Sequence, residues 1–236
     1  MQASSLDFWA QKWANGLDTW TKPTVNTLLV GHANRLPSNE DGPKRILMPL
    51  CGRSPDIIWL LDQGYIVVGV EFVADAILQF FAETKMNYTL TDVPEIPGAN
   101  LYKALEERLL IYQCNFLDLK ADVIGLFDGV YDKAALVAIT PSDHLKYIDV
   151  MRSVLKPTGT WLLLTVDLGV EGDQYRGPPF SVPFQAVAKL ISSFFSCVEV
   201  HSCVDADEAE VLKAEKNYTF ELTVRRSVIV IRPLSK

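Results

Sequence analysis

The sequence RILMPLCGRSPD at residues 45–56, together with YIVVGVE at residues 65–71, decides the fold class. Each stretch contains a short apolar run of strand length, and a helical pattern at residues 54–63, closed by Gly64, lies between the two runs. Two buried strands joined by a helix are the unit of a parallel sheet, because parallel strands need a long crossover between them. The pair therefore predicts the start of an α/β domain.

The alternation continues along the chain. Residues 85–106 contain Pro94, Pro97 and Gly98 and predict a long connection, and residues 169–183 predict a loop. The other expected elements are helices at 72–83, 142–155 and 184–195, and strands at 109–114, 127–132, 159–167, 197–201 and 218–231. Because the last two strands follow each other directly, we expect an antiparallel C-terminal edge. The sequence predicts a single doubly wound (Rossmann-like), mostly parallel sheet, with residues 1–236 as one domain.

The N-terminal segment has its own pattern. Phe8, Trp9, Trp13, Leu17 and Trp20 recur at roughly helical spacing, and a second helix is predicted at residues 26–35. A polar stretch at 36–44 with Pro and Gly follows. We therefore expect residues 1–36 to form a helical segment before the main domain.

Composition narrows the class of ligand. The chain has 22 Lys and Arg against 29 Asp and Glu, a net charge of −7, which disfavours nucleic acid or an anionic membrane as the main partner. No apolar stretch is long enough to span a membrane, and the first residues show no secretory signal. The 4 cysteines and 3 histidines form no metal-ligand spacing, so we expect no metal and a reducing, cytoplasmic location. A monomer that binds a small molecule is the expectation.

In a doubly wound sheet the ligand binds at the carboxyl ends of the strands, where the strand order reverses, and the turn at residues 49–56 should lie there. One interpretation of this turn is a dinucleotide site. That site needs the pattern G-x-G-x-x-G so that backbone amides can approach a pyrophosphate closely. Here only Gly52 is present, and Leu50 and Cys51 crowd the approach. The missing glycines disfavour this interpretation.

A second interpretation is the nucleophile elbow of a hydrolase, because Gly52-Arg53-Ser54 stands between a strand and a helix. The pattern G-x-S-x-G requires a second glycine, but residue 56 is Asp. Ser54, Pro55 and Asp56 also form a good helix start without any catalytic role.

A third interpretation is a cofactor that has an adenosine but no phosphates. Gly52 supplies a small residue at the turn, and Glu71 ends the next strand 19 positions later, close to the spacing of an acid that binds ribose hydroxyls. A carboxylate can accept hydrogen bonds from both hydroxyls of the ribose. S-adenosylmethionine fits this description best. The alternative is that Glu71 only caps the following helix.

Five segments in order resemble the thiopurine S-methyltransferase family of class I S-adenosylmethionine-dependent methyltransferases. They cover roughly residues 8–205: the tryptophans at 9, 13 and 20, PLCG at 49–52, VVGVE at 67–71, YDKAALVAI at 131–139 and GPPFSVP at 177–183. The resemblance implies a class I methyltransferase fold. It also implies transfer of a methyl group from S-adenosylmethionine to the sulfur of a small thiol, aromatic or heterocyclic, with S-adenosylhomocysteine as the product.

The resemblance also implies contacts, position by position. The segment Trp9–Trp20 would fold over the cofactor, Trp20 would also touch the substrate, and Asn115 and Phe116 would flank the adenine. The full set expected to bind the cofactor is Trp9, Trp13, Trp20, Leu50, Gly52, Glu71, Asn115, Phe116 and Lys133. Two features depart from the family: Lys133 stands where Arg is usual, and the tail from about Asp207 lacks a Trp-Gly pair.

Trp9 and Trp13 are four residues apart and can share one helical face. Core packing explains aromatic residues at that spacing. A lid is the alternative, because an indole face attracts a cation such as a sulfonium within about 6 Å. A lid would also keep water from the reacting centre.

Asp132 and Lys133 are the predicted catalytic residues, at the carboxyl end of the strand at 127–132. Asp132 can orient the substrate or accept a proton, or it can only cap the turn that follows. Lys133 would raise the thiolate fraction of a thiol whose ordinary pKa is about 8.5. Arg176 and Phe180 are the predicted walls of the substrate pocket, with Phe180 stacking on an aromatic acceptor.

Three rival functions remain open on the sequence. A nicotinamide-dependent oxidoreductase would share the fold. A module that binds the cofactor without catalysis is compatible with the departures at Lys133 and in the tail. Within the enzyme interpretation, the acceptor can also be a selenol, a tellurium or halide anion, or a small aliphatic thiol.

Overall fold

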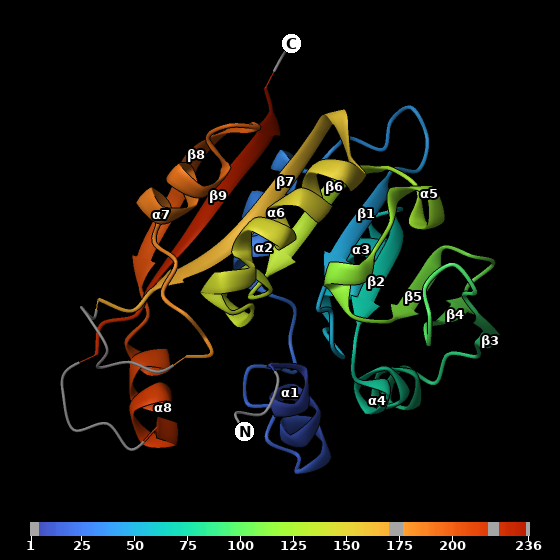
Figure 1. Ribbon diagram of the computed structural model, residues 1–236, viewed down its shortest axis with the longest axis horizontal. Helices are drawn as coiled ribbons and strands as arrows, with labels where there is room; N and C mark the ends of the chain where they lie inside the picture. Colours follow the sequence, from blue (N-terminus) through green and yellow to red (C-terminus); the bar gives the residue numbers. More distant parts are fainter. Residues whose placement is uncertain (1–4, 170–176, 217–221, 235–236) are drawn as a thin grey trace.

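A nine-stranded sheet forms the centre of the structure, a computed structural model that describes residues 5–169, 177–216 and 222–234. The strand order is β3-β4-β5-β2-β1-β6-β7-β9-β8 (Figure 1). The strands are β1 (Arg45–Pro49), β2 (Ile66–Glu71), β3 (Thr89–Asp92), β4 (Asn100–Ala104), β5 (Leu109–Gln113), β6 (Phe127–Lys133), β7 (Leu155–Asp167), β8 (Phe195–Val204) and β9 (Arg225–Pro233).

The five central strands are parallel, as the sequence predicts. β1 pairs with β2 on one side and with β6 on the other, while β5 and β7 extend the sheet outward. The chain thus leaves β1 in one direction and later returns to its other side, which makes the carboxyl ends of β1 and β6 the switch point of the fold. Val67 and Val68 of β2 are fully buried on opposite faces, which explains the unbroken apolar run.

Helices cover both faces of the sheet. α2 (Thr27–His32), α3 (Asp56–Asp62) and α4 (Ala74–Thr84) contribute to the core on one face. On the other face lie α5 (Ala121–Ile124), α6 (His144–Val154) and α7 (Phe184–Ile191). Two further helices, α1 (Ser5–Ala14) and α8 (Ala206–Lys216), lie beyond the carboxyl ends of the central strands (Figure 1).

Both edges of the sheet are antiparallel. The C-terminal edge of β7, β9 and β8 confirms the prediction. The prediction of a long connection at 85–106 is wrong, because that stretch contains β3 and β4, which pair with each other and with β5. All four residues of β3 are exposed, so no apolar alternation indicated a strand there.

The tail also differs from the prediction. The strand predicted at 218–231 is described only from Arg225, as β9, and residues 217–221 lie outside the described part of the chain. α8 was not predicted at all. Only Ala209 and Leu212 of this helix are buried, so its sequence carries little amphipathic signal.

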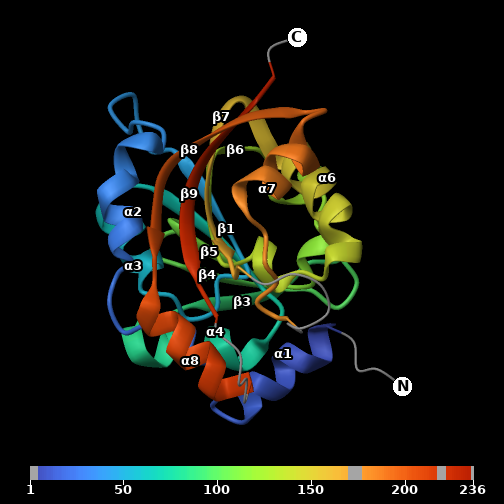
Figure 2. The same cartoon turned by 90° about the vertical axis from the view of Figure 1, so that its left-hand side faces the viewer.

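The N-terminal segment predicted at 1–36 divides into two parts. α1 and the residues up to Trp20 lie at the strand ends (Figure 1), where Nζ of Lys216 in α8 is 5.9 Å from the ring centroid of Phe8 in α1 (Figure 2). The second part packs on the sheet: Leu29 of α2 and Leu36 are buried in the core with Ile46. The backbone N–H of Asn26 donates to the Asp56 carboxylate at 2.8 Å, which fixes the point where the two parts meet.

The division of this segment can be tested by truncating two neighbouring side chains of α2. Leu29 is 0% exposed and Val30 is 51% exposed. We expect Leu29→Ala to lower the free energy of unfolding by roughly 2–5 kcal/mol, since it leaves a cavity in the core. Val30→Ala should change it by less than about 0.5 kcal/mol. Equal effects in urea unfolding would show that α2 is not part of the core.

Candidate active site

The turn after β1 is the centre of the candidate site. Leu50 and Gly52 both have left-handed backbone conformations, with φ of 47° and 52°. A residue other than glycine pays a steric cost of about 1–2 kcal/mol there, so the conformation of Leu50 is held by its surroundings. The N–H of Cys51 donates to the carbonyl of Val70 in β2 at 3.0 Å. The turn is therefore tied to the neighbouring strand.

Gly52 lets an indole lie against this turn. A Cβ atom at residue 52 would stand 3.1 Å from Cζ2 of Trp13, closer than ordinary van der Waals contact. The positive φ of Gly52 also disfavours any side chain. The glycine thus serves the packing of the N-terminal segment as well as the shape of the turn.

Glu71 joins the two turns that follow β1 and β2. One carboxylate oxygen accepts the N–H of Gly52 at 2.9 Å, and the other accepts the N–H of Val73 at 2.8 Å. Val73 precedes the first residue of α4, so Glu71 does cap the entry to that helix. It also lines the cavity described below, and a carboxylate has acceptor capacity beyond two hydrogen bonds. Burial raises the pKa of Glu71, and the backbone donors oppose that shift.

Three amides of the β1 turn are occupied. The N–H groups of Cys51 and Gly52 donate to Val70 and Glu71, and the N–H of Ser54 donates to the carbonyl of Cys51 at 3.2 Å. A pyrophosphate site needs such amides to point at the ligand. This turn instead directs them into the protein.

Asn115 and Phe116 follow β5 on the same side of the sheet. The Asn115 side chain accepts the N–H of Leu117 at 3.2 Å and so starts a short 3-10 helix at Phe116–Asp118. Phe116 is buried, and its ring lies 4.8 Å from the ring of Tyr147 in α6. Both residues line the cavity, and their contact with an adenine stays a prediction.

Three tryptophans form a wall of the site. Trp20 packs edge to face against Trp9 at 5.0 Å and against Trp13 at 5.8 Å between ring centroids. α1 ends at Ala14, so the helical spacing applies to Trp9 and Trp13 but not to Trp20, which returns to them from the following loop. The aromatic packing is therefore observed, and the role of this cluster as a lid over a cofactor stays a prediction.

Arg53 fixes this wall to the domain. Its guanidinium donates to Asp18, in the loop before Trp20, at 2.9 Å and also pairs with Glu83 of α4. Thr19 donates to Glu215 of α8 from the same loop. The wall is therefore held from the β1 turn, from α4 and from α8.

Asp132 and Lys133 point in different directions, because successive side chains of a strand alternate. Asp132 is fully buried and accepts hydrogen bonds from the N–H of Ala135 at 3.1 Å and from the hydroxyl of Tyr147 at 2.7 Å. Burial raises its pKa to about 6, against the effect of these donors. Asp132 does not line the cavity, so its geometry agrees with the alternative that it caps the turn, and a contact with a substrate stays a prediction.

Lys133 does line the cavity. Burial lowers the pKa of its ammonium group. Within the described part of the chain it makes no hydrogen bond or ion pair. An ammonium group in this position can stabilise an anion that enters the cavity.

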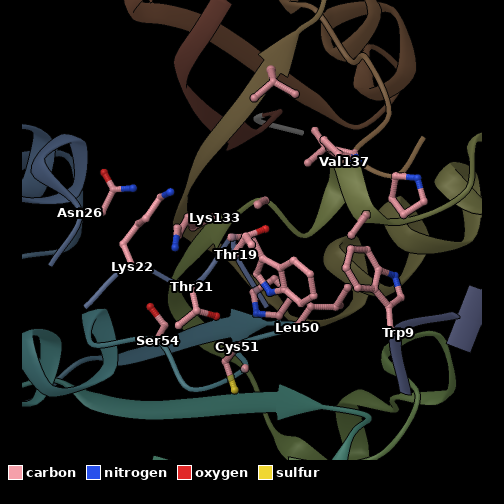
Figure 3. Close-up of a pocket in the computed structure, with 18 of the residues that line it drawn as sticks. Trp9, Thr19, Thr21, Lys22, Asn26, Leu50, Cys51, Ser54, Lys133 and Val137 are labelled. Atoms are coloured by element: carbon pink, nitrogen blue, oxygen red, sulfur yellow. The ribbon is translucent and has the colours of Figure 1, made fainter. Parts of the chain in front are cut away.

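One cavity of about 490 Å³ unites most of the predicted residues (Figure 3). Every residue expected to bind the cofactor lines it: Trp9, Trp13, Trp20, Leu50, Gly52, Glu71, Asn115, Phe116 and Lys133. Of the predicted substrate walls, Phe180 is not in the described lining and donates its backbone N–H to Val137 instead. Arg176 lies outside the described residues.

Sequence reasoning missed one side of the cavity. α8 supplies Glu208 and Glu215, and Arg226 of β9 pairs with Asp205 at 2.6 Å and with Glu208 at 3.1 Å. Lys22, from the loop after Trp20, was also missed. No motif marks these residues, and the departure of the tail from the family pattern was the one signal available.

Two searches of the described residues bear on other kinds of site. They contain no group of three or more His, Cys, Asp or Glu side chains placed to hold a metal ion. None of the helices in this part of the chain is long and apolar enough to cross a membrane.

Comparison with known proteins gives a consistent result. A family model described as thiopurine S-methyltransferase matches residues 4–226. The mouse (Mus musculus) thiopurine S-methyltransferase is 33% identical over 222 residues, covering 93% of this chain and 90% of the mouse protein. The dog (Canis lupus familiaris) enzyme is 36% identical over 197 residues, covering 83% and 79% of the two chains.

Solved structures share the fold at lower identity. A 1,6-didemethyltoxoflavin-N1-methyltransferase from Burkholderia thailandensis, solved with S-adenosylhomocysteine, has a TM-score of 0.55 at 17% identity and covers 94% of this chain and 86% of its own. A magnesium protoporphyrin IX methyltransferase from Synechocystis has a TM-score of 0.58 at 12% identity, covering 97% and 100%. These likenesses confirm the predicted α/β class I methyltransferase fold.

The buried carboxylate of Asp132 predicts a pH dependence of stability. Its pKa is raised to about 6 in the folded state, so the folded protein binds a proton that the unfolded chain has already released. Binding of this proton raises the free energy of unfolding. The contribution is complete below about pH 4, where the unfolded chain is also protonated, and it is lost as the pH rises through about 6.

We therefore expect the free energy of unfolding of the wild type, relative to Asp132→Asn, to fall by on the order of 2 kcal/mol between pH 4 and pH 6 and to level off above. Urea unfolding at several pH values measures this difference. A difference that stays constant, or that grows with pH, would contradict the burial of an ionisable carboxyl here.

Proposed function

We propose the function of this chain from one premise: it belongs to the thiopurine S-methyltransferase family. The chain transfers the methyl group of S-adenosylmethionine to the sulfur of a small thiol, aromatic or heterocyclic. The observation that carries this proposal is the single cavity that joins the tryptophan wall, the Glu71 carboxylate and the Lys133 ammonium group.

The residues present fit an adenosyl cofactor without phosphates. The cavity volume of about 490 Å³ is in the range of roughly 300–1,000 Å³ for small-molecule sites. Glu71 offers acceptor capacity for ribose hydroxyls, whereas the amides of Cys51 and Gly52 are already occupied within the protein. This arrangement supports S-adenosylmethionine and disfavours a nicotinamide dinucleotide.

The residues proposed to bind the cofactor contact different parts of it. Glu71 holds the ribose, and Asn115 and Phe116 flank the adenine. Leu50 and Gly52 shape the floor of the cavity. Trp9, Trp13 and Trp20 cover the cationic end, where an indole face near a sulfonium contributes about 0.5–2 kcal/mol.

When bound, S-adenosylmethionine supplies an electrophilic methyl group, so the protein needs no covalent catalysis. The chain's own task is to orient the thiol and to keep it ionised. Lys133 keeps the thiol ionised. A buried ammonium group stabilises the thiolate more strongly than an exposed one, because water does not screen it. The tryptophan wall excludes water from the same space.

Asp132 acts through the turn that it caps. Its bonds to the N–H groups of Ala135 and Leu136 fix the chain directly after Lys133. It is therefore a positioning residue in this proposal. Trp20 is the proposed aromatic contact for the acceptor.

The proposed partners and location follow the acidic composition and the cysteines. The net charge of −7 supports a small-molecule substrate rather than nucleic acid or a membrane surface. All 4 cysteines are free thiols in the structure, which supports a reducing location such as the cytoplasm. We infer a monomer.

The function itself is tested with S-adenosylmethionine carrying a labelled methyl group. Aryl, heterocyclic and alkyl thiols, a selenol and a phenol are compared side by side as acceptors. We expect label on the aromatic and heterocyclic thiols at the highest rate. Binding of the cofactor without transfer to any acceptor would indicate a module that binds the cofactor without catalysis. Preferential transfer to oxygen would also contradict the proposal.

Replacing Glu71 tests the ribose contact. We expect Glu71→Gln to weaken S-adenosylhomocysteine roughly 10- to 100-fold in calorimetry, because charge-assisted hydrogen bonds contribute about 1.5–3 kcal/mol. Glu199→Gln on the exposed face of β8 is the matched control and should bind like the wild type. Unchanged affinity in Glu71→Gln would remove the ribose assignment.

Replacing Lys133 tests the thiolate role through the pH profile. We expect the ratio of kcat/KM between the wild type and Lys133→Gln, for an alkyl thiol, to be large at pH 7 and to fall toward pH 9.5. Two effects act in this direction. The thiol ionises unaided at high pH, and Lys133, whose pKa is lowered by burial, loses its own proton. A ratio independent of pH would contradict this role.

A further inference from the structure

The two ends of the cavity differ in chemical character. Figure 3 shows Trp9 and Val137 at one end and Lys22, Lys133 and Asn26 at the other, with the β1 turn between them. Lys22 comes from the exposed loop that follows the tryptophan wall, and Lys133 comes from the carboxyl end of β6. Two segments far apart in the sequence thus bring two ammonium groups to one end of the same cavity.

Neither of these two ammonium groups is held in a direct contact by the protein. Within the described residues the ammonium groups of Lys22 and Lys133 make no hydrogen bond and no salt bridge, although carboxylates lie near both. Arg226, the third cation at this end, is paired with Asp205 and Glu208. Among the described residues, the two lysines are therefore the cations at this end that are free to contact a ligand.

The carboxylates close to the two lysines are already bonded to other groups. Asp56 is close enough to oppose the lowered pKa of Lys133, but its oxygens accept the N–H of Asn26 at 2.8 Å and the hydroxyl of Tyr131 at 2.9 Å. Burial, Arg226 and Lys22 act to lower the pKa of Lys133, while Asp56 and Glu208 act to raise it. Glu208 is itself paired with Arg226 at 3.1 Å. Lys22 is thus near enough to Lys133 for the two charges to repel, and an anion between them would relieve that repulsion.

The net charge of the cofactor does not balance the two lysines. S-adenosylmethionine carries an ammonium group, a carboxylate and a sulfonium, so its net charge is positive. An acceptor that brings two negative charges would balance the two lysines. A thiolate alone supplies one, and a carboxylate on the same molecule supplies the other.

We infer that Lys22 forms an acceptor subsite with Lys133, and that this chain prefers an aromatic thiol that also bears a carboxylate. Lys133 faces the thiolate and Lys22 binds the carboxylate. This inference rests on the proposed function, and it deepens that function by naming the class of thiol. Lys22 is exposed and lines the cavity, so its ammonium group can reach a polar substituent on the acceptor.

The test compares matched acceptors. Each isomer of mercaptobenzoate is paired with the mercaptotoluene of the same substitution, which has a similar shape and no carboxylate. We expect the wild type to prefer at least one acid over its neutral partner in kcat/KM, mainly through KM. In Lys22→Gln this preference should fall about tenfold, as expected for the loss of one charge-assisted contact. Lys22→Glu should reverse the preference.

Two controls separate this subsite from other effects. Lys189→Gln removes an exposed charge on α7, outside the lining of the cavity, and should keep the wild-type preference. Calorimetry with S-adenosylhomocysteine should give similar affinities for the wild type and Lys22→Gln. A loss of S-adenosylhomocysteine affinity in Lys22→Gln, with the acid preference intact, would assign Lys22 to the cofactor and overturn the inference.

The outcomes also distinguish this inference from the proposed function. Should no thiol be methylated, calorimetry of mercaptobenzoate and mercaptotoluene on the complex with S-adenosylhomocysteine still measures the subsite. Preferential, Lys22-dependent binding of the acid would support the subsite even then. Efficient methylation of mercaptotoluenes with no preference for the acids would leave the function intact and overturn the inference.

Discussion

The buried carboxylate of Glu71 is the constraint on which the site depends. It accepts one backbone N–H from the turn after β1 and one from the turn after β2, so it links the two turns to each other. The first of these turns carries Gly52, against which Trp13 packs, and the neighbouring Arg53 holds the loop of the tryptophan wall through Asp18. A single side chain at a strand end thus links the sheet to the cover of the cavity.

The same bonds define what the cavity can hold. Because the amides of Cys51, Gly52 and Ser54 are occupied inside the protein, the turn has little to offer a phosphate. The Glu71 carboxylate still has acceptor capacity, which suits the two hydroxyls of a ribose. At one end of the cavity, Lys133 and Lys22 supply positive charge, while Asp132, one residue from Lys133, is directed inward to fix the turn. The cavity therefore combines the Glu71 carboxylate, an aromatic wall and a cationic end.

The central strands were predictable because both faces of residues such as Val67 and Val68 are buried, and a continuous apolar run records that burial. β3 was not, since all its residues are exposed and only its pairing with β4 makes it a strand. In the site, Glu71 followed from its spacing to Gly52. The inward direction of Asp132 depends on Tyr147 of α6, and the meeting of Lys22 with Lys133 depends on the tertiary fold. Neither leaves a local pattern in the sequence.

The central claim is a cavity built for a phosphate-free adenosyl ligand, with its sugar held by Glu71. The most direct test is calorimetric titration of the wild-type protein with S-adenosylhomocysteine and, separately, with NADH. The account predicts saturable binding of one S-adenosylhomocysteine per chain and no measurable binding of NADH. Binding of NADH in place of S-adenosylhomocysteine would contradict it.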